Sequence, residues 1–282
     1  MIKEIIINSW PEFEERIQGE LRSIREVLIE MTGTPSIYRG QSDASWHLDT
    51  SLERVVGKNM GMVSYFAMIK EIQPEIETFT NNTWIQTENE YIEWLGNPNL
   101  RMRDIPDVEY MAYLRHHGYP SPLLDWSYSP YIAAYFAFRE ITNKAKYVAI
   151  FSYQLPMDML SLSSDPTIFP LYNSPRTNRR HYLQQSMYTL CCAQNDQGIY
   201  YASHEDVYSQ KRGEFYSGPY VTKYILPASE REAALMSLET YNINAYSLIG
   251  TEESLLETLF LREYAIKKAR KDKYPDWEGS EW

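Results

Sequence analysis

The chain has 282 residues, enough for one large domain or two small ones with a sizeable core. It carries 27 lysines and arginines against 38 aspartates and glutamates, a net charge of −11. This balance disfavours constitutive tight binding to nucleic-acid phosphates, which requires a basic surface.

Two further features point to a soluble, cytoplasmic protein without membrane association. No apolar run reaches the ~18 residues that span a bilayer, and the first one, Ile5-Ile6-Ile7, is too short for a signal peptide. The only cysteines, Cys191 and Cys192, are adjacent and cannot build a disulfide framework. Together with five histidines they show no metal-ligand spacing, so we expect no metal site.

The N-terminal half predicts mainly helices with few strands. A strand or extended arm at 5–7 is followed by an amphipathic helix, in which Phe13, Ile17 and Leu21 recur at helical spacing. The apolar run 131–138 predicts a buried helix. The expected elements in this half are a strand at 36–39 and helices at 11–31, 51–56, 62–79, 88–95, 109–117 and 131–138.

The C-terminal half predicts strands and then helices. Residues 154–178 are rich in Pro, Ser and Asn and predict a long irregular loop, a kind of segment that is often functional. In the last expected helix, Leu255, Leu259 and Tyr264 indicate an inner face. The expected elements are strands at 147–153, 185–192 and 220–226, helices at 230–237 and 254–270, and a charged tail at 271–282. No linker interrupts the pattern, so we expect one domain over 1–282 with its core at about 9–265.

Arg39 is the first candidate site residue. It ends the strand at 36–39, and Gly40 after it allows another group to approach the backbone closely. A guanidinium at this point can clamp a phosphate through paired hydrogen bonds. The alternative is an internal salt bridge with Asp43 or Asp125.

The second candidate is the segment His116 to Ser127. Asp125 can cap the following helix, although Ser127 and Ser129 compete for that position. Trp126 can stack on a flat ligand or fill the core, and the core is favoured. His117 can orient a loop or donate to a ligand.

The third candidate is the polar run Arg179 to Thr189. If it is extended, Gln184 and Gln185 face opposite sides and one amide points inward; the alternative is an ordinary edge strand. A local basic patch of Arg176, Arg179 and Arg180 can accept a phosphate-bearing ligand. The chain has no Gly-rich phosphate loop, no HExxH and no GxSxG.

These motifs resemble the FRG domain family. The resemblance rests on Tyr38-Arg39-Gly40-Gln41-Ser42-Asp43, on His116-His117-Gly118-Tyr119-Pro120 with Leu123-Leu124-Asp125-Trp126-Ser127, on Ala134-Tyr135-Phe136-Ala137, and on Arg180 to Gln184, Gln185, Ser186 and Tyr188. The chain departs from the family pattern at Tyr38 for Phe, at Ser121-Pro122 for Thr-Arg and at Ser186 for Gly.

The motif order is also similar to that of ADP-ribosyltransferases. The resemblance implies an α+β fold, with a split, mainly antiparallel sheet flanked by helices, that binds NAD. Arg39 would clamp the pyrophosphate, His117 or Gln184 would hold the ribose hydroxyls, and Gln184 or Glu214 would fill the third catalytic position. Tyr38, Trp126 or Tyr188 would sandwich the nicotinamide. The implied NAD-binding set is Tyr38, Arg39, Gly40, Gln41, His117, Ser121, Asp125, Trp126, Ser127 and Tyr188.

The expected function is therefore that of an NAD-dependent ADP-ribosyltransferase-like toxin or phage-defence effector. Its acceptor would be a protein, RNA or DNA, and its partner an antitoxin or another protein. The alternative is a non-catalytic nucleotide- or protein-binding module of a defence or toxin–antitoxin system. A nucleic-acid-binding protein is a third class, against which the net charge argues.

Overall fold

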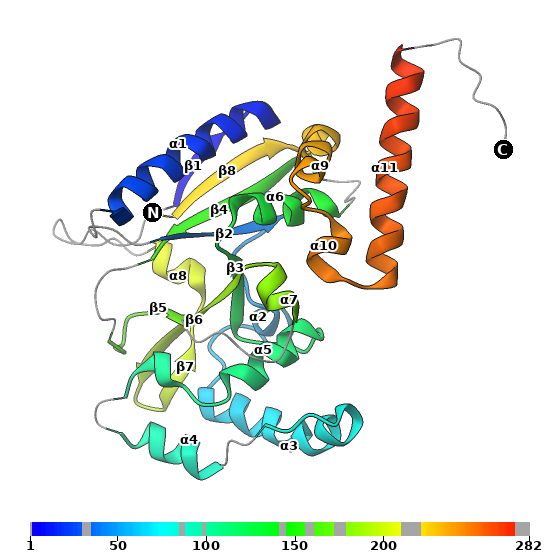
Figure 1. The fold of residues 1–282 in the computed structure, drawn as a ribbon. Coiled ribbons are helices and arrows are strands. Elements are labelled where there is room, and N and C mark those ends of the chain that lie inside the picture. Colours follow the sequence, from blue (N-terminus) through cyan, green and yellow to red (C-terminus); the bar gives the residue numbers. More distant parts are fainter. Residues whose placement is uncertain are drawn as a thin grey trace.

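The computed structural model describes most of the chain and shows a mixed α/β fold built on one open, mainly antiparallel sheet (Figure 1). The described ranges are 2–29, 35–84, 88–97, 100–140, 145–155, 161–171, 179–209 and 221–273. Two predicted site residues, Arg176 and Glu214, and the tail 274–282 lie outside them.

In this part of the chain the sheet has eight strands, in the order β1-β8-β4-β2-β3-β6-β5, with β7 paired to β6. Only β1 and β8 run parallel; the other neighbours are antiparallel. The strands are β1 (Ile2–Ile6), β2 (Ser36–Gln41), β3 (Leu123–Ser127), β4 (Tyr147–Gln154), β5 (Thr167–Leu171), β6 (Ser186–Asn195), β7 (Gly198–Tyr201) and β8 (Val221–Pro227).

The sheet splits between its two central strands. β2 pairs along its whole length with β4, and β3 does the same with β6. β2 and β3 themselves pair at a single position, Tyr38 opposite Ser127, and diverge from there. The expected mainly antiparallel sheet flanked by helices is thus confirmed, and the two strands diverge beside Arg39 and Asp125.

One face of β2, β4 and β8 is covered by α1 (Trp10–Ile29), α6 (Pro130–Arg139) and α9 (Arg231–Thr240). Helix α6 begins at Ser129, whose hydroxyl accepts a hydrogen bond from the Ile132 amide, followed by a proline at the first helical position. Ser129 is therefore the N-cap, and the alternative that gave this role to Asp125 is wrong.

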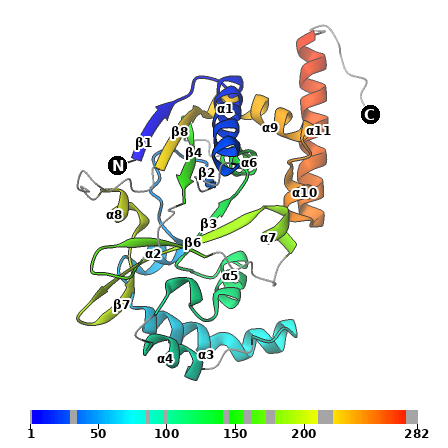
Figure 2. The same cartoon turned by 60° about the vertical axis from the view of Figure 1, so that its left-hand side comes forward.

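A second group of helices packs around β3, β5, β6 and β7 at the opposite end of the molecule from α1 (Figures 1 and 2). The first of these helices, α2 (Ser51–Val56), begins with a reciprocal capping box formed by Thr50 and Glu53. The helices are α2 (Ser51–Val56), α3 (Met62–Thr80), α4 (Glu88–Leu95) and α5 (Val108–His116), with short 3-10 turns at Met102–Asp104 and, before α9, at Ala228–Glu230.

Three predictions for the C-terminal half need correction. The expected loop 154–178 contains β5, which pairs with β6. The run after Arg179 is not an extended strand but a helix, α7 (Arg179–Leu183). In α11 (Glu252–Lys273), Leu255, Leu259 and Tyr264 are 36%, 44% and 51% exposed, so they do not form an inner face. The sequence also did not predict β7, α8 (His204–Ser209) or α10 (Ala245–Ile249) as separate elements.

Among the described residues, no helix combines the length and apolar character that a membrane crossing needs.

Candidate functional site

A cavity of about 520 Å³ opens where β2 and β3 diverge. Its walls come from β2, α5, β3, α6, α7, the turn between α7 and β6, and α10. Arginines are its most distinctive side chains, because four different elements each contribute one, and two carboxylates lie among them. The cavity residues with charged side chains are Arg39, Arg115, Arg139, Arg180, Asp125 and Glu140.

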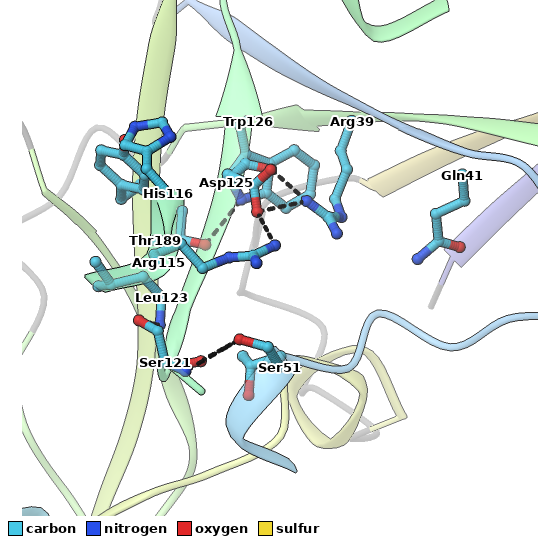
Figure 3. Close-up of polar contacts among 12 residues, drawn as sticks. Arg39, Gln41, Ser51, Arg115, His116, Ser121, Leu123, Asp125, Trp126 and Thr189 are labelled. Atoms are coloured by element: carbon cyan, nitrogen blue, oxygen red, sulfur yellow. Dashed lines mark hydrogen bonds and ion pairs between the residues drawn. The ribbon is translucent and has the colours of Figure 1, made fainter. Parts of the chain in front are cut away.

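Asp125 holds two of these arginines (Figure 3). The Arg39 Nη1 group donates both to the backbone carbonyl of Asp125, at 2.8 Å, and to its carboxylate, at 2.9 Å. The Arg115 Nη2 group donates to the same carboxylate oxygen at 2.7 Å. Arg39 thus bridges the split between the two strands, and the internal salt bridge with Asp125 is present at the edge of a cavity.

The two arginines favour the ionised form of the Asp125 carboxyl. Burial acts to raise the pKa of the Asp125 carboxyl, but the charges of Arg115 and Arg39 outweigh it and hold that pKa well below its usual range. The charge of Asp125 in turn raises the pKa of Arg115, whereas burial lowers the pKa of Arg39. Because the Asp125 side chain is 44% exposed, a ligand in the cavity meets an ionised carboxylate between two cations.

Gly40 sets how close α6 comes to this group. A Cβ at residue 40 would lie 1.9 Å from the Ala133 carbonyl oxygen and 2.6 Å from the Ala137 amide nitrogen. Both are backbone atoms of α6, so only glycine permits this packing. The motif Arg39-Gly40 therefore places a cation at the split while allowing the helix against the strand.

The other two arginines of the cavity, Arg139 and Arg180, lie on α6 and α7. Arg139, at the end of α6, donates to the Glu257 carboxylate of α11 at 2.9 Å. The Tyr135 hydroxyl donates to the same carboxylate at 3.2 Å. Arg180 lies on α7 and is half-buried. The cavity therefore depends on α11 for the orientation of one of its arginines.

A histidine pair joined by a tyrosine lies beside the cavity. His116, on the cavity wall, has its Nε2 2.7 Å from the Tyr188 hydroxyl, and His181 has its Nδ1 3.5 Å from the same oxygen. Burial lowers the pKa of His116 to about 4, although the charge of Asp125 acts in the opposite direction. His116 is therefore neutral at pH 7, and the low pKa makes its imidazole a weak base.

A second polar chain runs beneath the site. The Trp126 indole donates to the Thr189 hydroxyl at 2.8 Å, and that hydroxyl lies 2.9 Å from Nε2 of the fully buried His204. Burial, with a smaller contribution from the charge of Arg39, lowers the pKa of His204 to about 3. These two hydrogen bonds hold the Trp126 indole in the core.

This pKa predicts how stability depends on pH. His204 takes up a proton near pH 6.5 in the unfolded chain but only near 3 in the folded protein, so acidification below about 6.5 favours unfolding. We expect the free energy of unfolding to fall by several kcal/mol between these values, with His116 contributing in the same direction. His204→Gln keeps a hydrogen-bonding group for Thr189 and should flatten the profile, measured by urea denaturation at several pH values. Equal slopes for the variant and the wild type would contradict this account.

Part of the predicted site lines the cavity. Its lining includes Tyr38, Arg39, Gly40, Asp125, Trp126, Ser127 and Gln184. The rings of Tyr38, Trp126 and Tyr188 are at most 3% exposed, because the core encloses them. The structure therefore does not present these rings as the expected nicotinamide sandwich.

Other predicted residues lie away from the cavity lining. Gln41 donates to the His47 carbonyl at 3.0 Å, on the far side of Arg39 from Asp125 (Figure 3). The buried Ser121 bonds with Ser51, and its hydroxyl accepts from the Leu123 amide at 3.2 Å. His117 is exposed and follows the end of α5.

Gln184 reaches the cavity by a route that the sequence did not predict. It lies in the turn between α7 and β6, and Gln185 has a φ of +47°, so the two amides do not alternate along a strand. The Gln184 amide donates to the Leu248 carbonyl at 3.1 Å, and its own backbone carbonyl accepts from the Ser127 hydroxyl at 2.7 Å. The expected register of Gln184 and Gln185 is wrong.

Sequence reasoning missed Arg115, Arg139 and His116. Arg115 directly precedes the His-His-Gly motif and Arg139 closes the helix after Asp125, so both stood next to residues already singled out. His116 rather than its neighbour His117 meets the cavity. Which of two adjacent helical residues faces a site depends on how the helix is packed.

Part of the chain matches a known family model. Residues 34–146 match the family model of the FRG domain, a stretch that runs from just before β2 to just before β4. It includes Arg39, Arg115, Asp125 and Arg139, whereas Gln184 and α11 lie outside it. No curated protein and no solved structure matches the chain. Residues 34–146 are therefore similar to the FRG domain, and the paired Arg39 and Asp125 lie within this stretch.

Proposed function

We propose that the cavity at the split binds NAD through its pyrophosphate and that the protein transfers ADP-ribose to a macromolecule, as a toxin or defence effector. One observation carries the proposal: Arg39, Arg115, Arg139 and Arg180 come from four elements to one cavity of a protein with a net charge of −11. Guanidinium groups bind phosphate oxygens through paired hydrogen bonds.

Two further features support the choice of NAD. Ser127 and Gln184 adjoin the same cavity as Arg39 and offer groups for ribose hydroxyls. The ionised Asp125 carboxylate partly faces the cavity. In ADP-ribosyl transfer the bond between nicotinamide and the ribose C1 breaks, and the electron pair leaves with neutral nicotinamide. A carboxylate beside the cationic sugar then stabilises the charge that develops.

The reaction also needs a group that takes the acceptor's proton. The new bond forms between the ribose C1 and a nucleophile of the acceptor, which loses that proton. The lowered pKa of His116 on the cavity wall makes its imidazole a weak base, so water in the open cavity carries this proton away.

Incubation of the protein with NAD labelled in its adenylate phosphate, in the presence of cell extract, tests this function. Label that enters protein, RNA or DNA together with free nicotinamide is the expected result. Release of nicotinamide without label in a macromolecule would exclude transfer to the acceptors in that extract.

A non-catalytic binding module is the second candidate, and a specific observation favours it. The carboxylate of Asp125 already pairs with two of the four arginines, and the Gln184 amide is bonded to Leu248. Such a protein would bind NAD and ADP-ribose in the same cavity without releasing nicotinamide. Binding and release measured on one preparation separate the two functions.

Arg180 offers a specific test of phosphate binding. It lines the cavity from α7, whereas its neighbour Arg179 is exposed and is not part of the lining. A charge-assisted hydrogen bond contributes about 1.5–3 kcal/mol, so Arg180→Gln should weaken the binding of ADP-ribose at least about tenfold. Calorimetric titration of both variants measures this, with Arg179→Gln as the matched control. An equal loss in the two variants would mean that only general charge attraction is at work.

A further inference from the structure

The last helix carries its large apolar side chains on the outside. Leu256, Phe260 and Tyr264 are 60%, 71% and 51% exposed, whereas Ser254 and Thr258 are buried. The Phe260 and Tyr264 rings stack on each other, with centroids 6.0 Å apart. Both views draw α11 at the edge of the molecule, with no other described element on its outer side (Figures 1 and 2). Leu261 packs against the core, but the exposed parts of Leu256, Phe260 and Tyr264 have no partner among the described residues.

Polar contacts tie α11 to the remainder of the protein. Glu257 pairs with Arg139 of α6, and Arg262 pairs with Glu239 of α9. The Thr258 hydroxyl accepts a hydrogen bond from the Tyr246 amide of α10 at 3.0 Å. Phe260 and Tyr264 also border a cavity of about 700 Å³ between α11 and the helices α6 and α9. Because they remain 71% and 51% exposed, most of each ring is still available to meet another surface.

The outer residues follow the spacing of a helix that pairs with another helix. Leu256, Phe260 and Tyr264 continue a series with steps of three and four residues, the pattern of a coiled-coil seam. Exposed charges extend the series at both ends, acidic before the apolar part and basic after it. The full series, which we call the α11 stripe, is Glu253, Leu256, Phe260, Tyr264, Lys267 and Lys271.

We propose that the α11 stripe pairs with the same stripe of a second copy of this chain, antiparallel and centred on Phe260. This register sets Leu256 against Tyr264 of the partner subunit and Glu253 against Lys267 of the partner subunit. A parallel pair would instead set each charge against its like, which is unfavourable. A two-fold axis makes the surface complementary to itself, as a closed dimer requires.

The charge order of the stripe selects a second copy as its occupant. The stripe is acidic at one end, apolar in the middle and basic at the other end. When a second copy is turned through 180°, its basic end therefore faces the acidic end of the first. The apolar centre supplies the burial and the charged ends set the direction.

Sedimentation equilibrium of the full chain tests the dimer. We expect about twice the monomer mass of 33.2 kDa for the wild type and the monomer mass for Phe260→Glu. Phe79→Glu is the matched control, because Phe79 is 92% exposed on the distant helix α3 and should leave the dimer intact. Circular dichroism establishes that each variant is folded. A monomeric wild type, or equal dissociation by both variants, would overturn the proposal.

Charge reversal tests the direction of pairing. Glu253→Lys alone and Lys267→Glu alone each create two like-charge contacts in the antiparallel dimer, so each should weaken dimerisation at least about tenfold. The double variant restores opposite charges at both contacts and should recover the wild-type affinity. Additive losses in the double variant would contradict the antiparallel register.

Discussion

Gly40→Ala is expected to cost the protein about 3 kcal/mol of unfolding free energy or more, or to prevent folding. The new Cβ would lie 1.9 Å from a backbone oxygen of α6. Neither atom can rotate away, so α6 must shift from β2 and disturb the packing around Tyr38. Overpacking of a core typically costs about 1–3 kcal/mol, and a clash between two backbone segments belongs to the upper end. Urea denaturation measures the effect.

Gly19→Ala is the matched control for this substitution. Gly19 lies inside α1, and a Cβ added to it would meet no atom within 4 Å, so alanine adds helix propensity without a clash. Its stability should stay equal or rise by up to about 1 kcal/mol. If Gly40→Ala unfolds at the same urea concentration as Gly19→Ala, α6 does not approach β2 as closely as described.

Asp125→Asn is expected to lower both stability and the order of the cavity. The substitution removes the shared counter-charge of Arg39 and Arg115, whose side chains are only 12% and 20% exposed. Breaking a buried ion pair costs about 3–5 kcal/mol. Because the Asp125 side chain is 44% exposed and water screens it in part, we expect a loss of about 2 kcal/mol. Thermal and urea denaturation measure this loss.

Glu140→Gln is the control, since Glu140 is an exposed carboxylate on the same cavity. It should change stability by less than about 0.5 kcal/mol. An anion offers a second readout: ADP-ribose should raise the melting temperature of Asp125→Asn more than that of the wild type, because its phosphates replace the lost charge. A variant as stable as Glu140→Gln would show that the two arginines do not depend on Asp125.

The centre of the site was accessible from sequence because its residues stand in two short motifs. Arg39 followed by glycine indicated a cation at a strand end, and Asp125 was already considered as its partner. The contact itself depends on the split between β2 and β3, which a sequence pattern does not encode. Arg139 and Arg180 reach the cavity only because α6 and α7 pack beside it.

The errors have physical causes of the same kind. The expected alternation of Gln184 and Gln185 required an extended chain, but the left-handed conformation of Gln185 ends α7 and turns the chain before β6 begins. In α11 the apolar residues were assigned to the inside by the usual pattern. The helix instead turns Glu257, Thr258 and Arg262 towards polar partners on α6, α10 and α9, and only Leu261 of its described apolar residues packs against the core.

The net charge describes the chain as a whole and gives no information on the charges that line the cavity. A charge of −11 is spread over the whole chain, whereas four arginines converge within about 520 Å³. A local concentration of one charge attracts a ligand of the opposite sign even on an acidic protein. A small polyanion is therefore a better candidate ligand than a nucleic-acid backbone.

A crystal structure of the protein with ADP-ribose tests the central claim most directly. The account predicts the pyrophosphate in the cavity between β2 and β3, with its oxygens within hydrogen-bond distance of Arg180 and of at least one of Arg39 and Arg115. Crystals grown with saturating ADP-ribose in which this cavity holds no nucleotide, or in which the nucleotide binds elsewhere, would contradict it.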